Sequence, residues 1–175
     1  MFSNKDSRRV LAAVLSCAAP FLLGGLGFRQ NFETRLLAAH NRERAVVGAP
    51  TLHWDPQLAA GAKDWANHLA TENRFEHSPD EPGVEPKGEN LWAGSVDRFQ
   101  PETMVGLWVA EKSDYRPGVF PDNSRSGAVE RVSHYTQLIW VRTNKVGCAL
   151  ARGQKEDFLV CRYSQPGNVI GQRPV

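Results

Sequence analysis

The stretch Ser133-His134-Tyr135-Thr136-Gln137-Leu138-Ile139-Trp140 joins a histidine and its polar neighbours to three apolar residues in a row. A short apolar run of this kind is typical of a buried strand. A histidine beside tyrosine, threonine and glutamine can carry proton or metal chemistry. We therefore predict a buried strand in this stretch, with a functional site at its beginning.

The same stretch resembles the signature of the CAP superfamily, which groups cysteine-rich secretory proteins, antigen 5 and the plant pathogenesis-related proteins. The usual form of that signature is Gly-His-Tyr-Thr-Gln-Val-Val-Trp, and Ser133 stands in place of its glycine. Further similar segments follow in the family's order at residues 37–44, 77–91, 108–115 and 158–169. Gln165 departs from the family's second signature, where proline or one of a small set of alternatives is usual. The resemblance covers nearly all of the chain after residue 27.

Residues 1–27 differ in composition from the rest of the chain. They begin with basic residues and continue as an uncharged, mostly apolar run, which is the arrangement of a secretory signal peptide. We expect cleavage after Gly27. A membrane anchor is an alternative, because the run approaches the ~18 residues at which spanning helices begin, but Pro20 and three glycines interrupt it. A lipoprotein signal at Cys17 is disfavoured because the apolar run continues beyond it.

The rest of the chain, residues 28–175, suits one globular domain, which the resemblance identifies as a CAP (SCP-like extracellular) domain. The full sequence has 175 residues, of which 41% are hydrophobic and 23% charged, enough for one core. Residues 1–27 carry the whole net charge of +2, so the remainder is formally neutral. Neutrality argues against nucleic-acid binding and against charge-driven membrane binding. We expect a secreted or periplasmic protein with no stable membrane insertion after the signal is removed.

Cys148 and Cys161 are the two cysteines that remain after signal removal. Export makes their compartment permissive for disulfides. The apolar segments 146–151 and 158–164 flank a turn-forming sequence, and pairing them as a hairpin places the two cysteines opposite each other. We predict a structural disulfide in preference to a zinc site or a free thiol. Because the extra cysteines of plant and animal CAP proteins are missing, the chain resembles a minimal, bacterial-type member.

Three segments have apolar residues at spacings of three and four, which predicts amphipathic helices over 32–47, from Pro56 through Leu69, and from Pro101 through Val109. Both faces of the predicted hairpin are apolar, so a layer of helices must cover each face. We therefore predict an α+β fold, a three-layer α-β-α sandwich with a small, mostly antiparallel sheet between helices. The resemblance implies the same fold. His40, on the first helix, is expected to be a structural, hydrogen-bonded residue.

The resemblance also implies a central cleft with two histidines and two glutamates, here His77, Glu89, Glu111 and His134. Such a set can hold zinc or another divalent cation, and binding would be lost in acid because only neutral imidazole binds a metal. The alternative is a hydrogen-bonded network without metal. Gly88-Glu89-Asn90 is by composition a weak turn signal. We expect the cleft to be lined further by Ser78, Asn90, Tyr135 and Gln137.

Binding of a ligand or partner at this cleft is the function we expect. The resemblance implies a small apolar ligand, such as a lipid or sterol, or an extracellular protein. Five aromatic residues could form an apolar groove or belong to an ordinary core: Trp92, Phe99, Trp108, Phe120 and Tyr135. The alternative function is a metal-dependent or serine-type extracellular hydrolase, a protease or esterase that uses Ser78 or Ser133. Neither serine lies in a Gly-x-Ser-x-Gly context, so we favour binding over catalysis.

Overall fold

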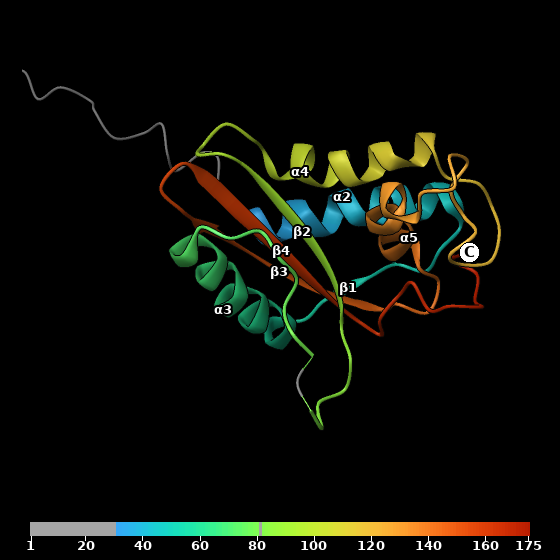
Figure 1. Ribbon diagram of the computed structural model, residues 1–175, viewed down its shortest axis with the longest axis horizontal. Coiled ribbons are helices and arrows are strands. Elements are labelled where there is room, and N and C mark those ends of the chain that lie inside the picture. Colours follow the sequence, from blue (N-terminus) through green and yellow to red (C-terminus); the bar gives the residue numbers. More distant parts are fainter. Residues whose placement is uncertain (1–30, 81) are drawn as a thin grey trace, which may run out of the picture.

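The computed structural model describes residues 31–80 and 82–175 (Figure 1). Its helices are α2 (Phe32–Val47), α3 (Pro56–Glu72), α4 (Pro101–Ala110) and α5 (Ser133–Ile139), and its strands are β1 (His53–Trp54), β2 (Gly88–Ser95), β3 (Lys145–Arg152) and β4 (Glu156–Ser164). Short 3-10 turns lie at Glu111–Ser113 and Val129–Arg131. The predicted signal peptide falls outside the described residues. Within them, no helix has the length and apolar character needed to cross a membrane.

The four strands form one sheet in the order β1-β3-β4-β2. β3 and β4 form the predicted hairpin, with Cys148 opposite Cys161, and a disulfide joins these two residues as predicted. β2 pairs with β4 in antiparallel fashion, while β1 runs parallel to β3. The sheet is therefore mostly antiparallel, as expected.

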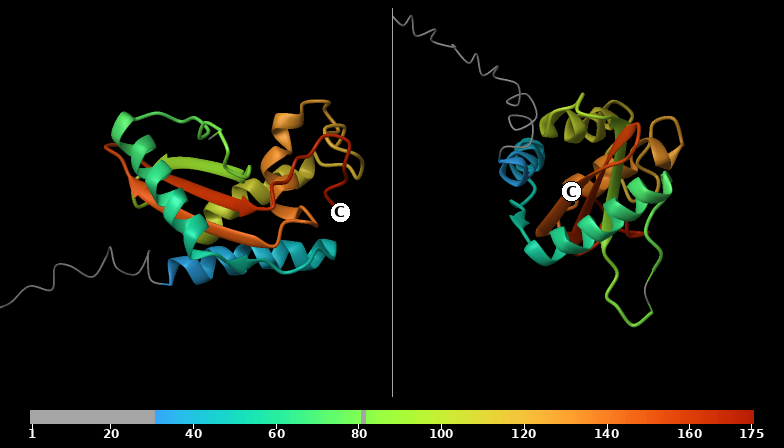
Figure 2. Two further views of the ribbon diagram at one scale, coloured as in Figure 1. Left: turned by 90° about the horizontal axis from the view of Figure 1, so that it is seen from below. Right: turned by 90° about the vertical axis from the view of Figure 1, so that its left-hand side faces the viewer.

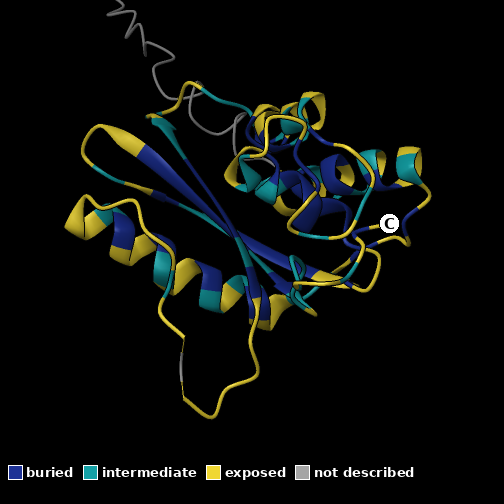
Figure 3. Ribbon diagram, turned by 45° about the vertical axis from the view of Figure 1, so that its right-hand side comes forward, coloured by how far each residue is buried: buried dark blue, intermediate teal, exposed yellow. Residues whose placement is uncertain are grey.

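Helices cover both faces of the sheet (Figure 2). α3 lies on one face, where its Ala62, Ala66 and Leu69 form a buried cluster with Phe158 and Val160 of β4. α2, α4 and α5 lie on the other face and share a larger core with the sheet. Buried and exposed stretches alternate along α3, as expected for a helix with one apolar face (Figure 3). The predicted three-layer α-β-α sandwich is confirmed.

Local signals account for the ends of the long helices. The Asp55 carboxylate accepts hydrogen bonds from the backbone N–H groups of Gln57 (2.9 Å) and Leu58 (3.0 Å), which caps the start of α3. Pro56 fits the first turn because that position makes no intrahelical N–H bond. α2 ends at Gly48, whose φ of 74° lies in the left-handed region that glycine adopts most easily.

Two predictions about local structure are wrong. The stretch from Ser133 begins with a helix, α5, and not with a buried strand. The Glu111 carboxylate accepts hydrogen bonds from the backbone N–H groups of His134 (3.1 Å) and Tyr135 (3.0 Å). These N–H groups are among the donors that have no partner within the helix at its start. The supposed turn Gly88-Glu89-Asn90 is the beginning of β2, which pairs with β4 along its whole length.

Candidate functional site

His77 and Glu89 form the first of two histidine–glutamate pairs. His77 lies in the loop after α3 and Glu89 lies on β2, and Nδ1 of His77 is 2.8 Å from Oε1 of Glu89. Ser78 donates its backbone N–H to Oε1 (3.0 Å) and its hydroxyl to Oε2 (2.8 Å). Burial raises the pKa of the Glu89 carboxyl, but the hydrogen bonds from His77 and Ser78 outweigh it and hold that pKa below its usual value. The carboxylate therefore stays ionised although its side chain is only 8% exposed.

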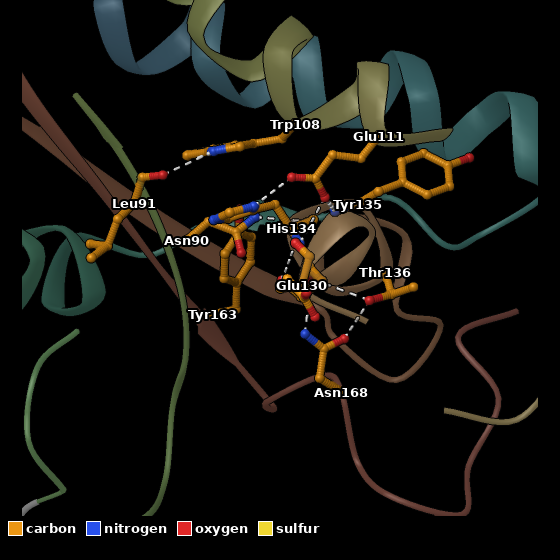
Figure 4. Close-up of polar contacts among 11 residues, drawn as sticks. Asn90, Leu91, Trp108, Glu111, Glu130, His134, Tyr135, Thr136, Tyr163 and Asn168 are labelled. Carbon is orange, nitrogen blue, oxygen red and sulfur yellow. Dashed lines mark hydrogen bonds and ion pairs between the residues drawn. The ribbon is translucent and has the colours of Figure 1, made fainter. Parts of the chain in front are cut away.

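His134 and Glu111 form the second pair (Figure 4). His134 lies at the start of α5 and Glu111 in the turn after α4, and Nδ1 of His134 is 2.6 Å from Oε1 of Glu111. The indole of Trp108 lies nearly parallel to the His134 ring, at an interplanar angle of 11° and a centroid distance of 6.1 Å. Trp108 is itself held by a hydrogen bond from its Nε1 to the carbonyl oxygen of Leu91 (3.1 Å). The Glu111 carboxylate at the edge of the His134 ring and the Trp108 indole on its face thus set the orientation of this imidazole.

Both pairs select the same imidazole tautomer. An ionised carboxylate only accepts hydrogen bonds, so the neutral ring of each histidine carries its proton on Nδ1. In the described part of the chain, neither Nε2 atom makes a hydrogen bond, and each keeps its lone pair available. Metal-binding histidines are oriented in this way, by a carboxylate or carbonyl on the other ring nitrogen. Glu89 and Glu111 are therefore positioned as orienting partners, and Nε2 of His77 and of His134 are the acceptors left for a ligand.

A cavity of about 430 Å³ lies against the first pair. Its lining includes His77, Ser78, Glu89, Arg162 and parts of the loop 79–88. Most of these side chains are polar or charged, so the cavity suits a polar ligand. The His134–Glu111 pair does not line it. Among residues 31–80 and 82–175, no three His, Cys, Asp or Glu side chains are grouped so that they could hold a metal ion.

Asn90, the residue after Glu89 on β2, is hydrogen bonded to the backbone of His134 in the protein interior. This buried residue on β2 donates its amide Nδ2 to the carbonyl oxygen of His134 (3.0 Å) and to the hydroxyl of Tyr163 (3.3 Å). Tyr163 in turn donates to Nε2 of His40 (2.8 Å), because Nδ1 of His40 donates to the carbonyl oxygen of Leu36 (2.8 Å). His40 is therefore a hydrogen-bonded residue of the interior, as expected, and it supports the strand that carries Glu89.

Of the four further residues expected to line the cleft, one lines the cavity and three are buried. Ser78 lines the cavity, whereas Asn90, Tyr135 and Gln137 are buried. Gln137 accepts the backbone N–H of Gly167 at its Oε1 (2.8 Å) and so holds the segment after β4 against α5. These buried residues fix the backbone around the two pairs.

Sequence reasoning missed Arg162, which lies on β4. Its Nε is 3.6 Å from Oε2 of Glu89, and it lines the cavity. A Cβ atom at Gly61 of α3 would lie 2.8 Å from Nη1 of Arg162, so this glycine leaves room for the guanidinium. A glycine within an otherwise helical pattern is a signal of such close packing, and it could have pointed to this approach.

The sequence profile of the Cysteine-rich secretory protein family (CAP) matches residues 37–163. The chain belongs to this family. It is 34% identical over 168 residues to "Pathogenesis-related protein PR-1 type" from Sambucus nigra, which covers 94% of this chain and 95% of the relative. It is 38% identical over 146 residues to "Pathogenesis-related protein 1C" from Nicotiana tabacum, which covers 83% of this chain and 82% of the relative. This CAP protein is therefore of the PR-1 type.

Solved structures of other proteins share the fold of this CAP protein. A crystal structure of NaASP2 with Zn²⁺ superposes with a TM-score of 0.67 at 22% identity, covering 86% of this chain and 87% of NaASP2. A crystal structure of MpPR-1i gives a TM-score of 0.53 at 23% identity, covering 78% of this chain and 89% of MpPR-1i. At this level of identity the likeness establishes the α-β-α fold.

Proposed function

We propose that this CAP protein is an exported binding protein that holds a polar ligand or a partner at its histidine–glutamate pairs. The observation that carries the proposal is that Nδ1 of both His77 and His134 contacts a glutamate, which leaves Nε2 of each neutral ring as an acceptor. Groups fixed in this way lose little conformational entropy when a ligand arrives, which favours binding. The cavity beside His77 gives such a ligand room.

Export is the second part of this proposal. Residues 1–27 have the composition of a secretory signal peptide, and residues 28–175 would form the exported CAP domain. The matching family is described as secretory. A disulfide such as Cys148–Cys161 persists in oxidising compartments, which supports a secreted or periplasmic location.

The lining of the cavity favours a polar ligand or an extracellular protein over a lipid or sterol. Trp92, Trp108 and Tyr135, three of the aromatic residues considered for an apolar groove, are at most 6% exposed and belong to the core. Phe99 and Phe120 are half-buried. These five residues therefore leave little aromatic surface for an apolar ligand.

The contacts of the two serines support binding over hydrolysis. The hydroxyl of Ser78 donates to the Glu89 carboxylate, and the hydroxyl of Ser133 donates to the backbone carbonyl of Glu130 (3.3 Å). A serine nucleophile needs a base within hydrogen-bond reach of its hydroxyl, usually an imidazole. In the part of the chain that the structure describes, neither hydroxyl bonds to a histidine ring.

A divalent cation such as zinc is a further candidate ligand for the two imidazoles, although the described residues bring no third His, Cys, Asp or Glu side chain into a metal-binding group with them. His77 and His134 would supply Nε2 atoms, and Glu89 and Glu111 would remain on the opposite ring nitrogens. A bound cation would supply Lewis-acid polarisation of a ligand oxygen. NaASP2, which shares the fold of this protein, has been crystallised with Zn²⁺.

Zinc titration by calorimetry tests the proposal. We expect saturable binding near neutral pH that weakens in mild acid, because a protonated imidazole has no lone pair for a metal. His77→Ala and His134→Ala should each abolish it, while His68→Ala, which removes an exposed histidine stacked on Trp65, should leave it unchanged. Equal zinc affinity in the wild type and in the His77→Ala plus His134→Ala double variant would refute a cation site at these rings.

A further inference from the structure

A second cavity, of about 220 Å³, lies outside the histidine–glutamate site. Glu85 and Pro86 line both cavities, so this short piece of loop is a wall that the two share. The second cavity is otherwise formed by the segment after α5 and by the segment after β4, at the end of the molecule where the chain terminates (Figure 1). Neither histidine of the two pairs lines it.

Apolar side chains form part of this cavity. Trp140 is only 1% exposed and packs edge-on against Phe120, with ring centroids 6.4 Å apart, so it is a rigid piece of the wall. Pro86, Pro166 and Val169 add further apolar surface. An apolar group of a ligand would lose part of its contact with water here.

The polypeptide around the cavity is held in place before any ligand arrives. The hydroxyl of Thr143 donates to the carbonyl oxygen of Gln165 (2.7 Å). The backbone N–H of Phe120 donates to the carbonyl oxygen of Gln172 (2.8 Å). Thr143 is itself buried. Because the wall is already ordered, binding would cost little conformational entropy.

Two opposite charges line the cavity without a partner in the described chain. The guanidinium of Arg142 and the carboxylate of Glu85 are on exposed residues, and neither makes a hydrogen bond or ion pair with another described residue. They are also not paired with each other. The side-chain amides of Gln165 and Gln172 add neutral donors and acceptors to the same wall.

The geometry points to a binding site for a small zwitterion with an apolar body, of which a free apolar α-amino acid is the simplest. Arg142 would pair with the α-carboxylate, for which the guanidinium fork is suited, and Glu85 would pair with the α-ammonium group. The apolar side chain would rest on Pro166 and Val169, because the adjoining Trp140 is almost completely buried. A water occupies about 30 Å³ in the liquid, so the cavity has room for about seven waters and suits an amino acid better than a sterol or a long acyl chain.

Titration with L-leucine, followed by NMR of the ¹⁵N-labelled protein, tests this site directly. We expect saturable shifts at the indole N–H of Trp140 and at the amides of Val169 and Gln172, with a dissociation constant on the order of 1 mM for so small a ligand. N-acetyl-leucine lacks the ammonium charge, leucinamide lacks the carboxylate, and glycine lacks the apolar body. Each should bind about tenfold more weakly, because each loses one of the three contacts.

Charge-removing variants locate the binding groups. Arg142→Gln and Glu85→Gln should each weaken leucine binding about tenfold. Arg42→Gln and Glu72→Gln, which remove matched charges from exposed positions on α2 and α3, should leave it unchanged. Failure of leucine to shift these signals, equal binding of leucine and N-acetyl-leucine, or wild-type affinity in Arg142→Gln would each overturn the proposal. His77 and His134 are intact in all of these variants, and Arg142 lines only the second cavity, so the Arg142→Gln result is independent of the histidine–glutamate site, whereas Glu85 lines both cavities.

Discussion

His40 is a buried histidine whose protonation state is set by its surroundings. It has no exposed surface and is hydrogen bonded at both ring nitrogens, to Leu36 and Tyr163. Burial lowers the pKa of His40 to about 4, and the positive charge of Arg44 adds to that effect against the hydrogen bond to Leu36. The neutral ring is therefore part of the folded state, and a protonated ring would disrupt the bond that Tyr163 donates to Nε2.

This burial predicts a loss of stability in mild acid. In the unfolded chain a histidine takes up its proton near pH 6.5, whereas the folded chain resists until about pH 4. The free energy of unfolding should therefore fall as the pH drops through this window, by up to about 3 kcal/mol from this residue. Urea unfolding at a series of pH values checks it, with His40→Gln as the comparison. If the free energy of unfolding has the same pH dependence in the wild type and the variant, His40 does not contribute to the loss of stability in acid.

At the scale of elements, Glu111 joins α4 to α5. Its carboxylate accepts two backbone N–H groups at the start of α5 and also the His134 ring. Glu111→Gln should therefore lower stability by about 1–3 kcal/mol, because the amide has no negative charge for the helix start and, with its oxygen on the two N–H groups, turns its NH₂ donor toward Nδ1 of His134. Urea unfolding measures the loss, and amide exchange at His134 and Tyr135 should become faster. Glu130→Gln is the matched control, and an equal effect of both variants would contradict the capping role.

Some elements of this fold could be predicted from the sequence and others could not. The hairpin register was predictable, because alternating faces and the opposed Cys148 and Cys161 both specify it. Helix α5 was not predictable, because a run of three apolar residues fits a strand or a helix equally. The Glu111 carboxylate that caps α5 also lies 23 residues before His134 in the chain. β2 begins with Gly88-Glu89-Asn90, residues with low strand propensity, and its pairing with β4 overrides that preference.

The candidate site was predictable in composition but not in arrangement. The family resemblance singled out His77, Glu89, Glu111 and His134, yet a motif does not say which histidine meets which glutamate. That pairing follows from the loop that brings His77 back to β2 and from the packing of α4 against α5. The orienting role of the glutamates is a property of these contacts.

At the scale of the whole molecule, Arg44 ties the helical layer to the loops around the sheet. This residue of α2 is completely buried, and its guanidinium donates to the carbonyl oxygens of Pro50 (2.7 Å), Leu138, Trp140 and Thr143 (2.9 Å each). Three of these carbonyls lie in α5 or the segment after it. Burial lowers the pKa of Arg44 to about 10, so the side chain remains charged at neutral pH.

Replacement of Arg44 should therefore weaken the whole fold. Lysine has three donors on one nitrogen and cannot reach carbonyls on several sides, so Arg44→Lys should leave buried acceptors unsatisfied and cost about 2–4 kcal/mol. Arg42→Lys, on the exposed side of the same helix, should cost less than about 0.5 kcal/mol. Urea unfolding followed by near-UV and far-UV circular dichroism separates two possibilities. Coincident transitions at lower urea indicate that Arg44 stabilises one cooperative unit, whereas an unchanged midpoint in Arg44→Lys would mean that packing alone holds α5 in place.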